Sequence, residues 1–119
     1  MNWFLAKIVY RIVCGDGDHT PQFDEQLRLI AAADEKGALK KAYAIGLQEE
    51  DCFYNTADKL VQWKFINVAE LFSITEMTDG AEVYSRIEEK DNGDQYTELV
   101  HRRAAYLEMN SLHRILETM

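Results

Sequence analysis

The segment LVQWKFINVAELFSI, residues 60–74, is the densest run of strand-forming residues in the chain. Its first half alternates apolar with polar side chains, which is the period of a strand with one buried face. The alternation then changes phase, because Ile66 and Val68 fall on the face opposite Phe65. An unbroken strand of this length would extend about 50 Å, beyond ordinary strands. The sequence predicts a central strand with a bulge or bend between residues 65 and 70; burial of both faces near its middle is the alternative.

The rest of the chain divides into elements by the same periodicity. A loop over 14–21 is rich in Gly and Asp, Asp34 is a suitable helix N-cap, and Asp79-Gly80 signals a turn. Residues 51–58 are predicted to be a loop. The predicted elements are strands 3–13, 23–33 and 81–89, and helices 34–50 and 95–118.

These elements predict an α+β fold in a single domain over 1–119. The sheet is expected to be mainly antiparallel and four-stranded, with element order ββαββα and helices packed on the sheet. In the first strand, alternate residues from Phe4 to Ile12 form the face that should meet the core. In the second strand, we assign Phe23, Leu27 and Leu29 to the core face, together with Glu25.

The apolar stripe of the last helix shifts at Asn110-Ser111, and both residues favour helix caps. We therefore expect either a break near 110–111 or final turns that face something other than the main core. The residues of the second stripe are Leu112, Ile115, Leu116 and Met119.

Composition limits the classes of function. The 119 residues carry a formal charge of −8, from 13 basic and 21 acidic side chains. An acidic chain is poorly suited to nucleic acid or to an anionic membrane, so we expect neither as a partner. Two cysteines do not make a disulfide framework, which favours a reducing, cytoplasmic setting. Lys7 and Arg11 interrupt the apolar N-terminus, so neither a signal peptide nor a membrane span is expected.

Several segments together resemble a bacterial domain-of-unknown-function family, number 4288 of that series. They are NWFLAKIVYRI, PQFDEQLRLIAA, the helix containing Ala38 and Ala42, VQWKFINVAEL and DGAEVYSRI. The resemblance covers about residues 2–88 and excludes the last helix. It implies a compact fold, and the family brings no activity or functional residue to this chain.

The loop after the first strand gathers side chains that can bind metal. Asp16, Asp18 and His19 offer carboxylates and an imidazole beside Cys14, and such ligands suit a divalent metal. The spacing matches no known metal motif, and a polar hairpin loop explains the same residues. Glu25 is a candidate general base on the predicted core face, or else lies at a strand end or bulge.

The second face of the predicted sheet collects cations beside aromatic rings, which suits an anion or a carboxylate-bearing partner. Cross-strand pairing with neighbouring acids is the alternative. The candidate ligand-binding residues are Trp3, Lys7, Arg11, Arg28, Lys64, Tyr84 and Arg86.

We expect a non-enzymatic binding or interaction module, because no nucleophile elbow, phosphate loop or dinucleotide motif is present. A small metal-dependent enzyme built on the 14–25 segment is the alternative. No cofactor is expected, and the partner is an unidentified protein or a small anion. A homodimer is also expected, because the second sheet face is too apolar to stay exposed to water. Its apolar residues are assigned as Trp3, Leu5, Val9, Val13, Ile30, Ile66 and Val68. The alternative is a monomer in which the first helix lies on one face of the sheet and the last helix on the other.

Overall fold

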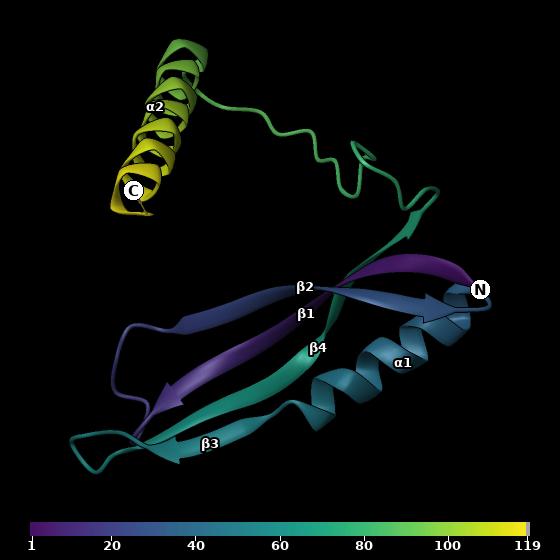
Figure 1. Cartoon of the computed structure of the whole chain (residues 1–119). Coiled ribbons are helices and arrows are strands. Elements are labelled where there is room, and N and C mark those ends of the chain that lie inside the picture. Colours follow the sequence, from purple (N-terminus) through teal and green to yellow (C-terminus); the bar gives the residue numbers. More distant parts are fainter. Residues whose placement is uncertain (119) are drawn as a thin grey trace. The chain divides into compact units, whose positions relative to one another are not determined.

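The computed structural model describes residues 1–118, and the chain divides into two compact units, 1–85 and 86–119. The first contains β1 (Asn2–Cys14), β2 (Gln22–Ala32), α1 (Glu35–Gln48), β3 (Asp51–Tyr54) and β4 (Leu60–Ile74), and the second contains α2 (Gly93–Thr118) (Figure 1). The predicted α+β class and the order ββαββα are confirmed. That all 119 residues form one domain stays a prediction.

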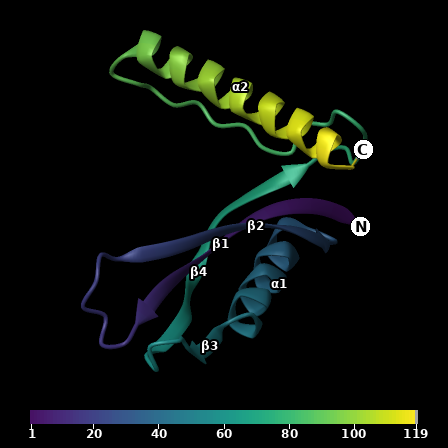
Figure 2. The same cartoon turned by 60° about the vertical axis from the view of Figure 1, so that its left-hand side comes forward.

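The four strands form one antiparallel sheet in the order β2-β1-β4-β3. The sheet is strongly twisted, and α1 lies along one of its faces (Figure 2). We call this the helix face and the opposite one the far face. β1 and β4 are the two inner strands, so residues 60–74 do form a central strand.

The phase change in β4 is a pair of bulges. The register between β1 and β4 shifts between Lys7 and Ile8 and again between Val9 and Tyr10, so Ala69 and Ile66 have no partner in β1. The predicted irregularity between residues 65 and 70 is thereby confirmed. Each bulge inserts one extra residue into β4. Odd-numbered side chains before the bulges, even-numbered ones between them and odd-numbered ones after them therefore point to the same face of the sheet. Those on the helix face, opposite alternate residues of β1, are Trp63, Phe65, Val68 and Leu71.

The fourth strand is not the predicted one. Residues 81–89 form no strand, whereas β3 lies inside the predicted 51–58 loop. A tight turn brings β3 onto β4: the Asn55 side chain accepts hydrogen bonds from the backbone amides of Ala57 and Lys59, at 2.9 and 3.0 Å. Asp58 in this turn has a left-handed φ of 61°. The turn chemistry at Asn55 therefore closes a hairpin, which periodicity over four residues is too short to show.

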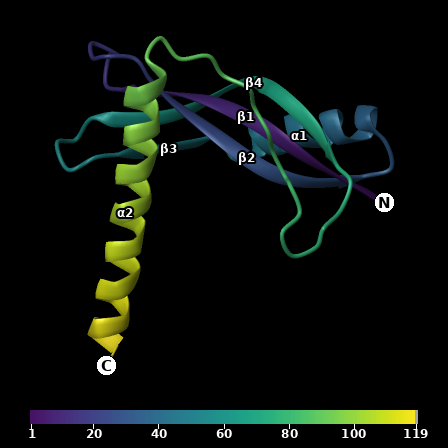
Figure 3. The ribbon, with the colours of Figure 1, turned by 90° about the horizontal axis from the view of Figure 1, so that it is seen from above.

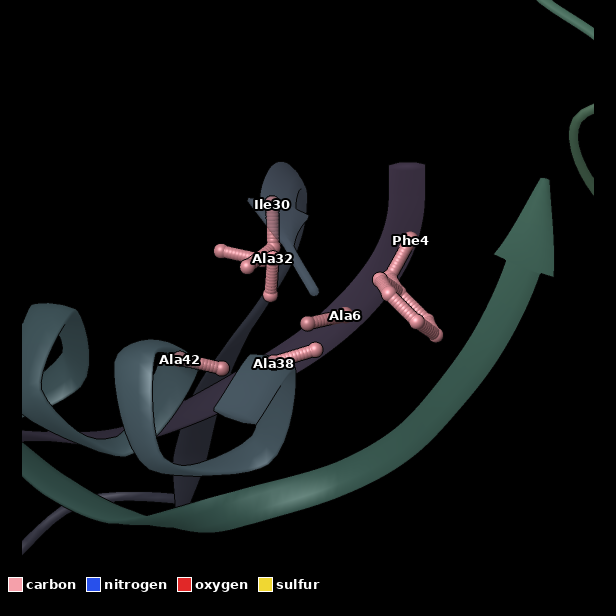
Figure 4. Close-up of a cluster of buried hydrophobic side chains, with 6 residues drawn as sticks. All are labelled: Phe4, Ala6, Ile30, Ala32, Ala38 and Ala42. Atoms are coloured by element: carbon pink, nitrogen blue, oxygen red, sulfur yellow. The ribbon is translucent and has the colours of Figure 1, made fainter. Parts of the chain in front are cut away.

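Small side chains let α1 pack closely on the helix face. The Asp34 carboxylate caps α1 by accepting from the Gly37 amide at 2.7 Å, as predicted. The predicted stripe of Ala38, Ala42 and Gly46 is buried against the sheet. Their partners include side chains of β1 and β2, so the core lies between α1 and these strands (Figure 4). The buried residues of this cluster are Phe4, Ala6, Ile30, Ala32, Ala38 and Ala42.

A buried tyrosine of the sheet also bonds to the helix. Tyr10 lies fully buried on β1, and its hydroxyl donates to the Gly46 carbonyl at 2.7 Å. Burial is the main cause that raises the pKa of the Tyr10 phenol. Because the folded state holds this proton more tightly than the unfolded state, the contribution of Tyr10 to stability is constant below about pH 10 and falls as the pH rises further.

We expect Tyr10→Phe to lower the free energy of unfolding by about 1–3 kcal/mol at neutral pH, because the Gly46 carbonyl loses its buried donor. The variant should also lose less stability than the wild type between about pH 9 and 11, since it has no phenol to ionise at this site. Urea denaturation at a series of pH values measures both effects. Equal slopes above pH 10 in the two proteins would contradict the account of Tyr10.

In the second unit, α2 is one continuous helix. The Asn92 side chain caps it by accepting from the Gln95 amide at 3.0 Å. The helix runs through Asn110 and Ser111 without interruption, so the predicted alternative of a break there is wrong (Figure 3). Met119 lies outside the described residues. No helix within residues 1–118 is both long and apolar enough to cross a membrane.

Candidate interaction surface

The far face has a charged pair at its centre. Lys7 on β1 lies opposite Glu70 on β4, with Nζ 3.2 Å from Oε2. The two side chains are only 14% and 33% exposed, and beyond this ion pair Oε2 has no hydrogen-bond partner among the described residues. The hydrogen bond to Glu70 raises the pKa of Lys7; burial opposes this, and the charges of Glu25 and Tyr84 add to it. Lys7 therefore stays charged until the pH rises through this raised pKa, so the pair persists at neutral and mildly alkaline pH.

Beside this pair, β2 presents a row of large apolar side chains. Phe23, Leu27 and Leu29 are 53%, 50% and 51% exposed. They belong to the far face because β1 and β2 pair with Lys7 opposite Leu27 and Leu5 opposite Leu29. These three half-exposed large side chains form an apolar strip, which exposed Glu25 interrupts between Phe23 and Leu27; exposed apolar side chains gathered on one strand are typical of contact surfaces.

Two further contacts frame this strip. The Arg11 guanidinium lies over the Phe23 ring, 5.7 Å from its centroid. Also on the far face, where Phe72 of β4 lies opposite Leu5, the Phe72 ring meets Tyr84 edge to face, with 5.2 Å between ring centroids. The segment that follows β4 therefore returns over the far face at Tyr84, although it forms no strand.

The structure brings together only part of the predicted cation cluster. Trp3, Lys7, Arg11 and Lys64 share the far face, and Arg11 pairs directly opposite Lys64. Tyr84 lies at the same face, where its ring contacts that of Phe72. Ligand binding by these residues stays a prediction.

Two members of the predicted cluster lie elsewhere. Arg28 is on the helix face, where its Nε and Nη2 donate to the Gln26 amide oxygen at 3.1 and 2.7 Å. Arg86 belongs to the second unit, where its Nε lies 3.2 Å from Glu88.

The prediction of which β2 side chains lie on which face of the sheet is inverted, because the actual register differs from the assumed one by one residue. Residue numbers of β1–β2 partners sum to 34, as in Asn2 with Ala32, so partners share parity. Even-numbered residues of β2 thus share the face of Phe4, and Ile30 is buried under α1. Val68 also packs toward this core. The predictions that placed Ile30 and Val68 on the second face, and Glu25 on the core face, are wrong; Glu25 is exposed on the far face opposite Val9.

The strip on β2 was missed for this reason. Alternation within a strand separates two faces but does not say which face meets the core. That depends on the number of residues in the 15–21 loop, where Gly15 and Gly17 adopt left-handed φ values of 61° and 84°. Residues in the left-handed region favour Gly, and loops of this length have no fixed register rule.

The candidate metal loop is organised by its own backbone. His19 Nε2 accepts from the Cys14 amide at 3.0 Å, and Nδ1 lies 2.9 Å from the Thr20 carbonyl. Asp16 accepts from the Asp18 amide at 3.0 Å. Both imidazole nitrogens are therefore used within the loop. Among residues 1–118, no group of three or more His, Cys, Asp and Glu side chains is placed to hold a metal ion.

A network on the helix face was also not foreseen. Asp24 Oδ2 accepts from the side-chain Nε2 of Gln26 at 2.7 Å and from the Trp63 indole at 3.1 Å. Together with the bonds from Arg28 to Gln26, this orders three polar side chains along β2. No sequence signal links Asp24 to Trp63, because the two residues lie on strands separated by β1.

Comparison with known proteins identifies the fold unit. The model of a family described as domain of unknown function (DUF4288) matches residues 3–85. This range coincides with the first compact unit, 1–85. Neither a curated protein nor a solved structure shows significant similarity to the chain.

Proposed function

Since the chain belongs to the DUF4288 family, a domain of unknown function, we propose that it is a non-enzymatic interaction module that associates with a second copy of itself. One observation carries the proposal: the half-exposed strip of Phe23, Leu27 and Leu29 runs along a strand at the edge of the sheet. Burial of such a strip against a copy removes the same apolar surface twice.

The charges of the far face support a protein partner over a small anion. Lys7 is already neutralised by Glu70, and Arg11 lies on the Phe23 ring. An anion at Lys7 or Arg11 would have to displace these contacts, which leaves Lys64, exposed opposite Arg11, as the far-face cation of this group without such a contact among the described residues. The partly covered pair and the apolar strip instead resemble the core of a protein interface, where charged groups are few and paired.

We also propose that the protein acts in the cytoplasm. Cys14 and Cys52 are both free. Free thiols persist in reducing compartments, which supports this location.

Sedimentation at micromolar concentration tests the proposed self-association. We expect the wild type to sediment as a dimer and Leu27→Asp as a monomer, because the substitution removes a central apolar side chain of the strip and adds a second carboxylate next to Glu25. Leu27 is half exposed, so the variant should keep its circular dichroism spectrum. Leu47→Asp on α1, equally exposed at 48%, is the matched control and should remain dimeric. A wild type that stays at 13.8 kDa would overturn the proposal.

A further inference from the structure

β2 leaves one long edge unpaired. It runs from Gln22 to Ala32 at the end of the strand order, and no other strand within residues 1–118 lies beside its outer edge. Such an edge presents backbone donors and acceptors that can pair with another strand. Near the end of this strand, the Ala31 carbonyl accepts from Lys41 Nζ at 3.1 Å.

We propose that β2 pairs antiparallel with β2 of a second copy, about a two-fold axis at Gln26, so that Asp24 of each chain faces Arg28 of the other. This inference rests on the proposed function and specifies its interface. The two four-stranded sheets would then join into one continuous sheet.

Charge selects this register among its neighbours. Residues directly opposite in an antiparallel pair point to the same face, so a two-fold axis must lie on a residue. An axis at Gln26 places Asp24 opposite Arg28 in both directions. An axis at Glu25 would oppose two Glu25 carboxylates, and an axis at Leu27 would leave Asp24 opposite Ile30. Of the three, only the axis at Gln26 gives complementary charges.

On the far face the same register gives two kinds of pair, Phe23 with Leu29 and Glu25 with Leu27. With the axis at Gln26, Phe23 of each chain lies opposite Leu29 of the other. Both side chains are half exposed in the single chain. Aromatic–aliphatic pairs across neighbouring strands are stabilising, so the Phe23–Leu29 pairs would join the two strips at their ends, while Glu25 faces Leu27 beside the axis.

The charged side chains are already held in place on the helix face. Both hydrogen bonds to Asp24 go to Oδ2, and Oδ1 has no partner among residues 1–118. Arg28 uses Nε and Nη2 toward Gln26, which leaves Nη1 for an acceptor. Side chains ordered before association lose less conformational entropy when they pair.

Mixing two charge-reversed variants tests the register. Asp24→Lys alone sets Lys against Arg28 of the other copy, and Arg28→Glu alone sets Glu against Asp24, so each should weaken self-association by about tenfold or more. An equimolar mixture restores two opposite-charge pairs in the heterodimer. We expect the mixture to sediment as dimer at concentrations where each variant alone is monomeric. Rescue by mixing cannot arise from contacts within one chain.

Exposed charges on α1 provide the control: Glu35→Lys, Lys40→Glu and their mixture should all behave as wild type. A wild-type dimer without rescue in the Asp24→Lys and Arg28→Glu mixture would overturn the register and leave the proposed function standing. A monomeric wild type would overturn both.

A cysteine variant keeps the register testable if a charge reversal does not fold. In a Cys14→Ser, Cys52→Ser background, Gln26→Cys should form a disulfide-linked dimer on mild oxidation, because residue 26 faces its own copy. Gln22→Cys, which would face Ile30 of the other chain, should not. Equal cross-linking at both positions would contradict the axis at Gln26.

Discussion

Replacing Ile30 by Ala is expected to lower the free energy of unfolding by about 2–4 kcal/mol. Ile30 is fully buried between β2 and α1, in contact with the cluster that contains Ala38 and Ala42. Truncation removes buried methyl and methylene groups and leaves a cavity beneath a helix whose Ala side chains are too short to fill it. Urea denaturation at a fixed protein concentration measures the loss.

Leu29→Ala is the matched control, because the two residues are adjacent on β2 and lose similar volume. Leu29 is half exposed on the far face, so its truncation should cost less than about 1 kcal/mol in the folded monomer. The pair is best compared in the Leu27→Asp background, where self-association does not contribute. A larger loss for Leu29→Ala than for Ile30→Ala would show that the two faces of β2 are exchanged.

Gly46→Ala is expected to destabilise the fold by about 1–3 kcal/mol, although Ala normally favours helix over Gly by about 1 kcal/mol. A Cβ added at Gly46 would collide with the Phe65 ring. The ring cannot move aside freely, because it packs against Tyr10 and Tyr43 at centroid distances of 5.9 and 5.2 Å. The helix would have to move away from β4, which also weakens the bond from Tyr10 to the Gly46 carbonyl.

A double-mutant cycle with Phe65→Ala isolates the collision. Phe65→Ala alone costs stability through lost packing, but it also frees the space next to Gly46. In that background Gly46→Ala should become neutral or stabilising by up to about 1 kcal/mol, as helix propensity alone predicts. If Gly46→Ala cost the same with and without the Phe65 ring, close packing of α1 on β4 would not be the reason for this glycine.

Local chemistry made much of the fold predictable. The Asp34 cap and the small stripe of α1 follow from side-chain type and a period of 3.6 residues. The bulges of β4 follow from a phase change that no regular strand can accommodate. Segment 81–89 shows the limit, because an apolar/polar alternation permits a strand without providing a neighbour to pair with.

The candidate surface was less predictable than the fold. Whether Leu27 or Arg28 lies on the far face depends on one residue of register, and the loop between β1 and β2 has no turn signature that fixes it. The pairing of Lys7 with Glu70 likewise depends on the bulges, which shift β4 relative to β1 by one residue at each step. Sequence shows which residue types are available, whereas register decides which of them meet.

Hydrogen exchange at increasing protein concentration tests the central claim, that β2 carries the interaction surface, most directly. We predict that the outward-pointing backbone amides of residues 22–30, which alternate with those bonded to β1, become slower to exchange as concentration rises through the micromolar range, because they acquire hydrogen-bond partners. Amides of α1 and β3 should keep their rates. Protection that rises in α1 or β3 while β2 stays unchanged would contradict the account.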